Sequence, residues 1–183
     1  MWHTGRANSK RFAERYPLNY FAYGSNMSLA RLRARVSSAR PVGTYQLMQH
    51  ELRFHKSGAD GSGKCDAFHT GENGHRVLGV LYQIDPAHKA ALDRIEGLGH
   101  GYAEKEVALY GPEGQLARAC TYYALRIDAS LPAYSWYREH VLTGAREARL
   151  PATYINGILG QHTVADPDHH RERRELGIYR PGK

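Results

Sequence analysis

The segment Asn19–Ser28 reads NYFAYGSNMS, and its pattern changes from strand to turn to helix. The apolar run Tyr20–Tyr23 is typical of a short strand and ends abruptly at the GSN turn, and a helical pattern follows over Ser28–Val36. Such a turn directs unpaired backbone N–H groups into one small space, where the helix dipole favours negative charge. The segment therefore predicts a pocket for a carboxylate or an oxyanion. A plain strand–turn–helix connection, with glycine at positive φ, explains the same pattern.

The composition predicts a globular protein. The chain has 183 residues, enough for one domain with a sizeable core, and 42% of them are hydrophobic. No apolar run approaches the roughly 20 residues of a membrane helix, and we expect no signal peptide. Cys65 and Cys120 are the only cysteines and form no CxxC motif, which argues against a disulfide framework or a thiolate zinc site. These features predict a cytoplasmic protein with no membrane partner.

The formal net charge is +7, and part of the positive excess lies near the two ends. Residues 1–16 carry four basic side chains against one acidic, and residues 166–183 carry five against four. Nucleic-acid-binding surfaces usually concentrate basic residues in one stripe with aromatic residues between them. We therefore expect no nucleic-acid partner. The predicted organisation is a basic N-terminal extension (1–16), a folded domain (17–163) and a charged C-terminal tail (164–183).

Strand and helix patterns alternate through the central part of the chain. The expected strands after the GSN turn are 41–55 (one or two segments), 64–69, 76–84, 102–110 and 116–126. The expected helices are 28–36, 85–96, 132–144 and 151–161. Asp85-Pro86 provides the cap and first residue of a helix, and Gly97 ends it. Because loops and hairpins join most strands, the pattern predicts an α+β domain on a mostly antiparallel sheet or small barrel.

Glu96 occupies an unfavourable position in the last turn of the helix that Gly97 ends. The negative end of the helix dipole disfavours an exposed carboxylate there by about 0.3–1 kcal/mol, and burial would raise the pKa of the carboxyl further. A raised carboxyl pKa suits a general acid–base catalyst that works near neutral pH. A surface glutamate paired with Arg94 or Lys89 explains the position equally well.

Thirteen tyrosines could provide an apolar wall with hydroxyl groups for a small polar ligand. Tyr102 follows Glu96, Tyr122 and Tyr123 lie in one strand with opposite faces, and Tyr137 lies on a helix. Ordinary packing also explains any single tyrosine. The eleven histidines have no cysteine or carboxylate at metal-ligand spacing, so we expect no metal site. No nucleophile elbow or phosphate-binding loop is found in the sequence.

Four elements, in this order, resemble the γ-glutamylcyclotransferase family. They are the YFAYGSNM segment, Leu92 to Gly97, Gly101-Tyr102, and Tyr123 with Tyr137. The resemblance covers residues 19–160 and leaves the two ends without a counterpart. It implies a small mixed, mostly antiparallel β-barrel or curled sheet with surrounding helices. The implied reaction cleaves a γ-glutamyl dipeptide to 5-oxoproline and a free amino acid, with no metal and no organic cofactor.

The resemblance also implies roles for individual residues, with Glu96 as the catalytic glutamate. The implied substrate-binding residues are Tyr20, Phe21, Ala22, Tyr23, Gly24, Ser25, Asn26, Tyr102, Tyr123 and Tyr137. The Ser25-Asn26 pair resembles the branch that acts on γ-glutamyl amino acids, whereas the glutathione and γ-glutamylamine branches usually carry leucine at position 26. The expected partner is a small γ-glutamyl compound, bound by a monomer or homodimer.

Two other functions fit the sequence. The first is a γ-glutamyl deprotecting lyase of a biosynthetic pathway on the same fold, which would act on bulkier amines. The second is a non-catalytic module whose basic ends contact nucleic acid or an acidic partner. Steeply salt-dependent binding to RNA or DNA, without turnover of any γ-glutamyl compound, would identify the second.

Overall fold

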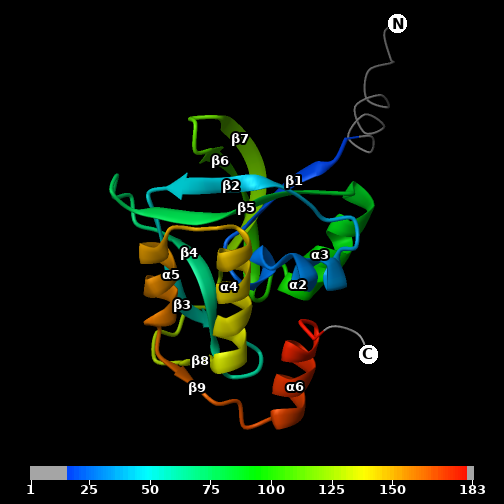
Figure 1. Cartoon of the computed structure of the whole chain (residues 1–183), viewed down its shortest axis with the longest axis vertical. Helices are drawn as coiled ribbons and strands as arrows, with labels where there is room; N and C mark the ends of the chain where they lie inside the picture. The colour runs from blue at the N-terminus through cyan, green and yellow to red at the C-terminus, as the bar shows by residue number, and fades with distance from the viewer. Residues whose placement is uncertain (1–15, 181–183) are drawn as a thin grey trace, which may run out of the picture.

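A closed barrel of five strands forms the centre of the structure, a computed structural model that describes residues 16–180 (Figure 1). Around the barrel the strands are β1 (Leu18–Ala22), β5 (Arg76–Ile84), β2 (Arg40–Met48), β6 (Tyr102–Tyr110) and β7 (Leu116–Ala124). Neighbours are antiparallel, except that β7 pairs in parallel with β1 and closes the barrel. The expected α+β fold on a mostly antiparallel barrel is confirmed.

Two smaller sheets and the helices surround this barrel (Figure 1). Strands β3 (His50–Ser57) and β4 (Gly63–His69) form an antiparallel pair, and β8 (Ala133–Tyr134) and β9 (Thr163–Val164) a parallel pair. The helices are α2 (Leu29–Arg35), α3 (Lys89–Glu96), α4 (Ser135–Glu147), α5 (Ala152–Leu159) and α6 (His169–Gly177), with 3-10 turns η1 (Ser25–Met27) and η2 (Pro86–His88). Helices α4 and α5 lie side by side below the barrel.

Capping residues set the start of α2, which follows the GSN turn, and the end of α3, whose last residue is Glu96. The Ser28 hydroxyl accepts a hydrogen bond from the Arg31 N–H at the start of α2. Asp85 caps η2 in the same way, and Gly97 ends α3 in the left-handed conformation with φ of 67°. Glu96 is therefore the last residue of its helix, as the sequence predicts.

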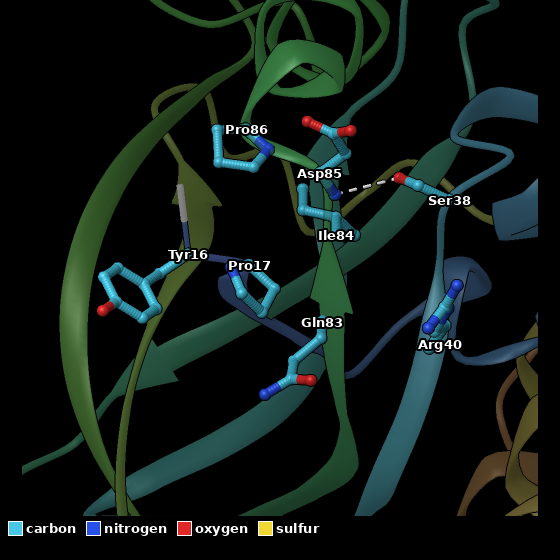
Figure 2. A pocket seen from close by; sticks show the side chains of 8 residues that line it. All are labelled: Tyr16, Pro17, Ser38, Arg40, Gln83, Ile84, Asp85 and Pro86. Carbon is cyan, nitrogen blue, oxygen red and sulfur yellow. Dashed lines mark hydrogen bonds between the residues drawn. The ribbon is translucent and has the colours of Figure 1, made fainter. Parts of the chain in front are cut away.

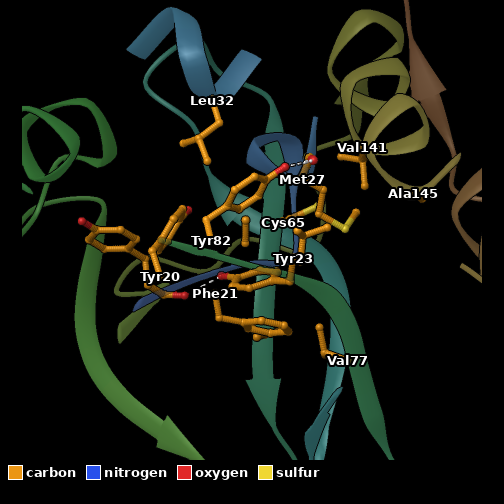
Figure 3. Close-up of a cluster of buried hydrophobic side chains, with 14 of the residues drawn as sticks. Tyr20, Phe21, Tyr23, Met27, Leu32, Cys65, Val77, Tyr82, Val141 and Ala145 are labelled. Carbon is orange, nitrogen blue, oxygen red and sulfur yellow. Dashed lines mark hydrogen bonds between the residues drawn. The ribbon is translucent and has the colours of Figure 1, made fainter. Parts of the chain in front are cut away.

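The strand and turn of the opening segment are part of the core, to which they contribute Tyr20, Phe21, Tyr23 and Met27 (Figure 3). Phe21 and Tyr82 are almost fully buried, and the Tyr82 hydroxyl donates a hydrogen bond to the Met27 carbonyl over 2.7 Å. Helix α4 lies against η1 at Gly144, where a Cβ atom would come within 2.4 Å of the Ser28 nitrogen. This close approach holds α4, and hence its side chains, beside the GSN turn.

The segment predicted as a charged tail contains part of β9 and all of α6. Its Asp166 is fully buried, accepts a hydrogen bond from the Trp136 indole over 2.7 Å and pairs with Arg171 over 2.5 Å. On α6, Glu175 pairs with Arg31 of α2 over 2.5 Å. The segment thus packs on α4 and α2. The predicted N-terminal extension, Tyr16 apart, lies outside the described residues.

Candidate active site

Glu96 lies inside the molecule, at the carboxyl end of α3. Its side chain is 14% exposed. The Oε1 atom accepts a hydrogen bond from Asn26 Nδ2 over 2.8 Å and an ion-paired contact from Arg35 Nη1 over 3.3 Å. Groups from η1 and α2 therefore hold the carboxylate from two directions.

Asn26 connects this carboxylate to the rest of the site. Its amide nitrogen also donates to the Tyr20 hydroxyl over 3.0 Å, and its amide oxygen accepts from Arg35 over 2.9 Å. Both hydrogens of the Asn26 amide group are thus used, and the side chain has one orientation. Burial, together with the nearby Glu96 carboxylate, raises the pKa of Tyr20 well above its ordinary value, so this hydroxyl is neutral at pH 7.

The turn beside Asn26 presents backbone N–H groups. Those of Gly24, Ser25 and Asn26 have no acceptor within residues 16–180. Gly24 has a φ of −110°, so positive φ does not explain this glycine. A Cβ atom at position 24 would lie 2.9 Å from the Cβ of Cys65 on β4. Glycine is therefore favoured because β4 approaches the turn closely at Cys65. We call the three N–H groups of this turn the amide cradle.

These groups line a small space, which we call the inner cavity, of about 30 Å³. Its lining residues are Tyr20, Tyr23, Gly24, Ser25, Asn26, Cys65, Glu96, Tyr102, Tyr122 and Tyr137. The Tyr102 hydroxyl donates to the Cys65 carbonyl over 2.7 Å, and the Tyr137 hydroxyl accepts from the Cys65 N–H over 2.9 Å. Burial raises the pKa of the Cys65 thiol to about 12, and it also raises the pKa values of Tyr102 and Tyr137. Glu96 carries the only carboxyl group among these lining residues.

The structure brings most of the predicted site residues to this cavity, but not all. Tyr20, Tyr23, Gly24, Ser25, Asn26, Glu96, Tyr102 and Tyr137 line it. Phe21 and Ala22 instead belong to the core, where the Phe21 ring lies against Gly79. Tyr123 lies outside the cavity, with Lys105 Nζ 5.3 Å from its ring centre. Successive strand residues face opposite sides, so Tyr122 takes the position expected for Tyr123.

Sequence reasoning missed three other residues of the site: Tyr122, Cys65 and Arg35. The alternation of the strand was a signal that only one of Tyr122 and Tyr123 could face the cavity, without showing which. Cys65 had no local signal, because β4 reaches the turn only through the fold. Arg35 lies at the end of α2, seven residues after Ser28, and its role depends on how α2 and α3 meet.

A wider space, which we call the outer pocket, borders the inner cavity and measures about 260 Å³. Ser25, Glu96, Tyr102 and Tyr137 line both spaces. The outer pocket adds Arg31, Arg35, Lys56, Gly58, Ala59, Asp60, Lys64 and Ile95. Glu96 therefore lies at the boundary between a narrow tyrosine-lined space and a charged one.

A further pocket of about 340 Å³ lies away from Glu96, between Tyr16 and Arg40 (Figure 2). Its Asp85 N–H donates to the Ser38 hydroxyl over 3.0 Å, and the Asp85 carboxylate caps η2. The polar groups of Asp85 are thus engaged in structure. Although this pocket is larger, the paired carboxyl and amide groups of the inner cavity make that cavity the better candidate for catalysis.

Two further findings concern the described part of the chain. Within residues 16–180, no group of three or more His, Cys, Asp or Glu side chains is placed to hold a metal ion together. Over the same range, no helix is both long and apolar enough to cross a bilayer.

Comparisons with known proteins agree with this geometry. Residues 76–158 match the AIG2-like family. Over 143 residues the chain is 30% identical to the γ-glutamylcyclotransferase of Bos taurus and 31% identical to that of Homo sapiens, covering 74% of this chain and 73% of each relative. A solved γ-glutamyl cyclotransferase structure superimposes with a TM-score of 0.77 at 24% identity, covering 87% of this chain and 98% of that one. This chain belongs to the γ-glutamylcyclotransferase family.

Proposed function

We propose that this protein is a γ-glutamylcyclotransferase that releases 5-oxoproline from γ-glutamyl amino acids, with Glu96 as the acid–base residue. One observation carries the proposal. Glu96 lines the same inner cavity as Gly24, Ser25 and Asn26, whose backbone N–H groups have no acceptor within residues 16–180. The names of the related proteins support the same reaction.

The reaction needs one proton carrier. The α-amine of the γ-glutamyl group attacks its own γ-carbonyl carbon, so a new C–N bond forms and the original amide C–N bond breaks. Glu96 accepts the proton that the α-amine loses and returns it to the leaving amine. Because ring closure is intramolecular, much of the catalysis consists of holding the substrate in a folded conformer. No electron is transferred to or from the substrate, so the proposal includes no redox cofactor.

The inner cavity has groups suited to that conformer. The amides of Gly24–Asn26 can stabilise the developing oxyanion or bind the substrate carboxylate, since both carry negative charge. Asn26 and Arg35 keep the Glu96 carboxylate at the mouth of the cavity. The neutral phenols of Tyr102 and Tyr137 form part of the cavity wall, where the Tyr137 hydroxyl accepts from Cys65 and keeps its own proton to donate.

The substitution Glu96→Gln tests the proposal. Glutamine keeps the side-chain shape and can still accept from Asn26, but it cannot carry the proton. We expect 5-oxoproline release from γ-glutamylalanine, measured by mass spectrometry, to fall about 100-fold or more. Undiminished release would refute the role of Glu96.

Glu106→Gln is a matched control, because Glu106 is an exposed glutamate paired with Arg118 on the barrel surface. This variant should release 5-oxoproline at the wild-type rate. An equal loss in both variants would show that removal of a negative charge anywhere affects the assay, which would overturn the assignment.

A γ-glutamyl deprotecting lyase is the second candidate. The outer pocket of about 260 Å³ has room for an amine larger than that of alanine. Rates with γ-glutamylalanine and with bulky γ-glutamyl amines distinguish the two candidates. Faster turnover of the bulky amines would favour the lyase.

A further inference from the structure

The boundary between the two spaces predicts where each half of a substrate lies. This inference rests on the proposed function. The reacting amide must lie at Glu96, which lines both the inner cavity and the outer pocket. The γ-glutamyl half is common to all substrates of the proposed reaction. Its negatively charged group lies at the amide cradle, because the inner cavity of about 30 Å³ is too small to enclose the whole half. The leaving amine therefore extends into the outer pocket.

The lining of the outer pocket has a net positive charge. Its lining includes four cationic side chains and two carboxylates, those of Asp60 and Glu96. Three of the cations have carboxylate partners: Arg31 with Glu175, Arg35 with Glu96, and Lys64 with Asp60. The fourth is Lys56.

Lys56 is 8% exposed and has no ion pair or hydrogen-bond partner for its ammonium within the described residues. Its Nζ lies 4.7 Å from the ring centre of Tyr102, which lines both spaces. Burial lowers the pKa of Lys56, while the Glu96 and Asp60 carboxylates act in the opposite direction. This ammonium has no carboxylate bonded to it among the described residues, so an anion bound in the outer pocket could pair with it.

The backbone around Lys56 also favours an anion in the pocket. Lys56 on β3 lies directly opposite Lys64 on β4, and like charges at paired positions destabilise a sheet. At Gly101, a Cβ atom would come within 3.0 Å of the Lys56 Nζ, so glycine leaves the space that the ammonium occupies. The chain thus holds two like charges together at the wall of the outer pocket.

We propose that Lys56 is a specificity-determining residue whose ammonium binds a carboxylate carried by the leaving amine. The protein then prefers γ-glutamyl amino acids over γ-glutamyl amines that lack this carboxylate. Lys64, the other lysine at this wall of the outer pocket, is already paired with Asp60, which leaves the Lys56 ammonium to bind the anion.

Two substrates that differ only in this carboxylate provide the test: γ-glutamylalanine and γ-glutamylethylamine. In the wild-type protein kcat/KM should be higher for γ-glutamylalanine. Lys56→Met should reduce this preference about 10- to 100-fold, the range for a lost hydrogen bond to a charged group, mainly through KM for γ-glutamylalanine. Lys56→Arg, which keeps the charge, should retain most of the preference.

Lys105→Met is the matched control, since Lys105 also lies over a tyrosine ring, that of Tyr123, but lines neither space. It should keep the wild-type preference. If Lys56→Met slows both substrates equally, or leaves the preference intact, the inference is wrong while the proposed function stands. If the wild-type protein turns over neither substrate, the proposed function fails and the inference falls with it.

Discussion

The inner cavity and the outer pocket share Glu96 and three other lining residues but differ in charge and in volume. The inner cavity is walled by neutral phenols, a thiol and backbone amides. The outer pocket carries four cations and two carboxylates in a larger volume. In a narrow space lined otherwise by neutral groups, one carboxylate is the single candidate for proton transfer, whereas a charged and wider space recognises ligands by electrostatic attraction. The difference suggests that reaction chemistry and substrate choice depend on separate parts of one site.

Different structural elements surround the two spaces. The inner cavity is formed by the barrel strands and by α4, which packs against η1 without an intervening side chain at Gly144. The outer pocket is bordered by the β3–β4 turn, where Asp60 accepts from Lys64, and by α2 and α6 through the Arg31–Glu175 pair. Changes at the inner cavity should therefore affect kcat, and changes at the outer pocket should affect KM or stability.

The largest expected effect beyond the acid–base residue itself is at Asn26. The substitution Asn26→Leu keeps a similar volume but removes the hydrogen bonds to Glu96, Tyr20 and Arg35. A misplacement of a reacting group by about 1 Å can cost about 100-fold in rate, so we expect kcat for γ-glutamylalanine to fall about 10- to 100-fold. Steady-state kinetics, with a thermal melt to confirm folding, measure this. If the substitution changed KM alone, the assignment of kcat to the inner cavity would be wrong.

An intermediate effect is expected at Glu175, behind the outer pocket. Glu175→Gln leaves the buried guanidinium of Arg31 without its carboxylate. We expect a loss of about 1–3 kcal/mol in the free energy of unfolding, measured with urea, and a change in kcat of no more than about 5-fold. A loss of kcat as large as that of Asn26→Leu would show that Glu175 has more than a structural role.

The same cluster predicts how stability depends on pH. Contacts with His140 and Arg31 lower the pKa of Glu175 to about 2, and burial lowers the pKa of His140 to about 4. Both folded-state values lie below the ordinary ones, so the stabilisation is complete near neutral pH. It is lost first as His140 gains a proton between about pH 6.5 and 4, and then as Glu175 does between about 4.5 and 2. Melting temperatures should therefore fall on acidification, and Glu175→Gln should flatten the lower part of this curve.

The smallest effect is expected at Tyr123. Its ring faces Lys105 and not the inner cavity, so Tyr123→Phe should change kcat and KM less than about 2-fold. Tyr122→Phe is the matched neighbour. It removes the hydroxyl that donates to Asp93 over 2.6 Å from a residue that does line the cavity, and should have the larger effect. The reverse order would show that the strand face was assigned wrongly.

Local signals explain why much of the fold could be predicted. Strand β5 has the predicted bounds, Arg76–Ile84, because its apolar and β-branched run has clear ends. Helix α3 ends at Glu96, since Gly97 adopts the left-handed conformation. Helix α4 begins three residues later than predicted, at Ser135, because Ala133–Tyr134 pair with β9. That difference depends on a strand thirty residues away, which no local pattern shows.

The sequence by itself determined the barrel elements, the GSN turn and the helix-terminal position of Glu96, because these follow from periodicity, capping residues and glycine over a few neighbouring residues. Only the tertiary structure decided which tyrosine faces the inner cavity and that Cys65 lies too close to position 24 for a Cβ atom. It further decided that Lys56 lines the outer pocket without a salt-bridge partner among residues 16–180. It also decided that the C-terminal segment folds back, with Asp166 buried against Trp136. Each of these depends on contacts between residues distant in sequence, whose geometry is set by barrel closure and helix packing.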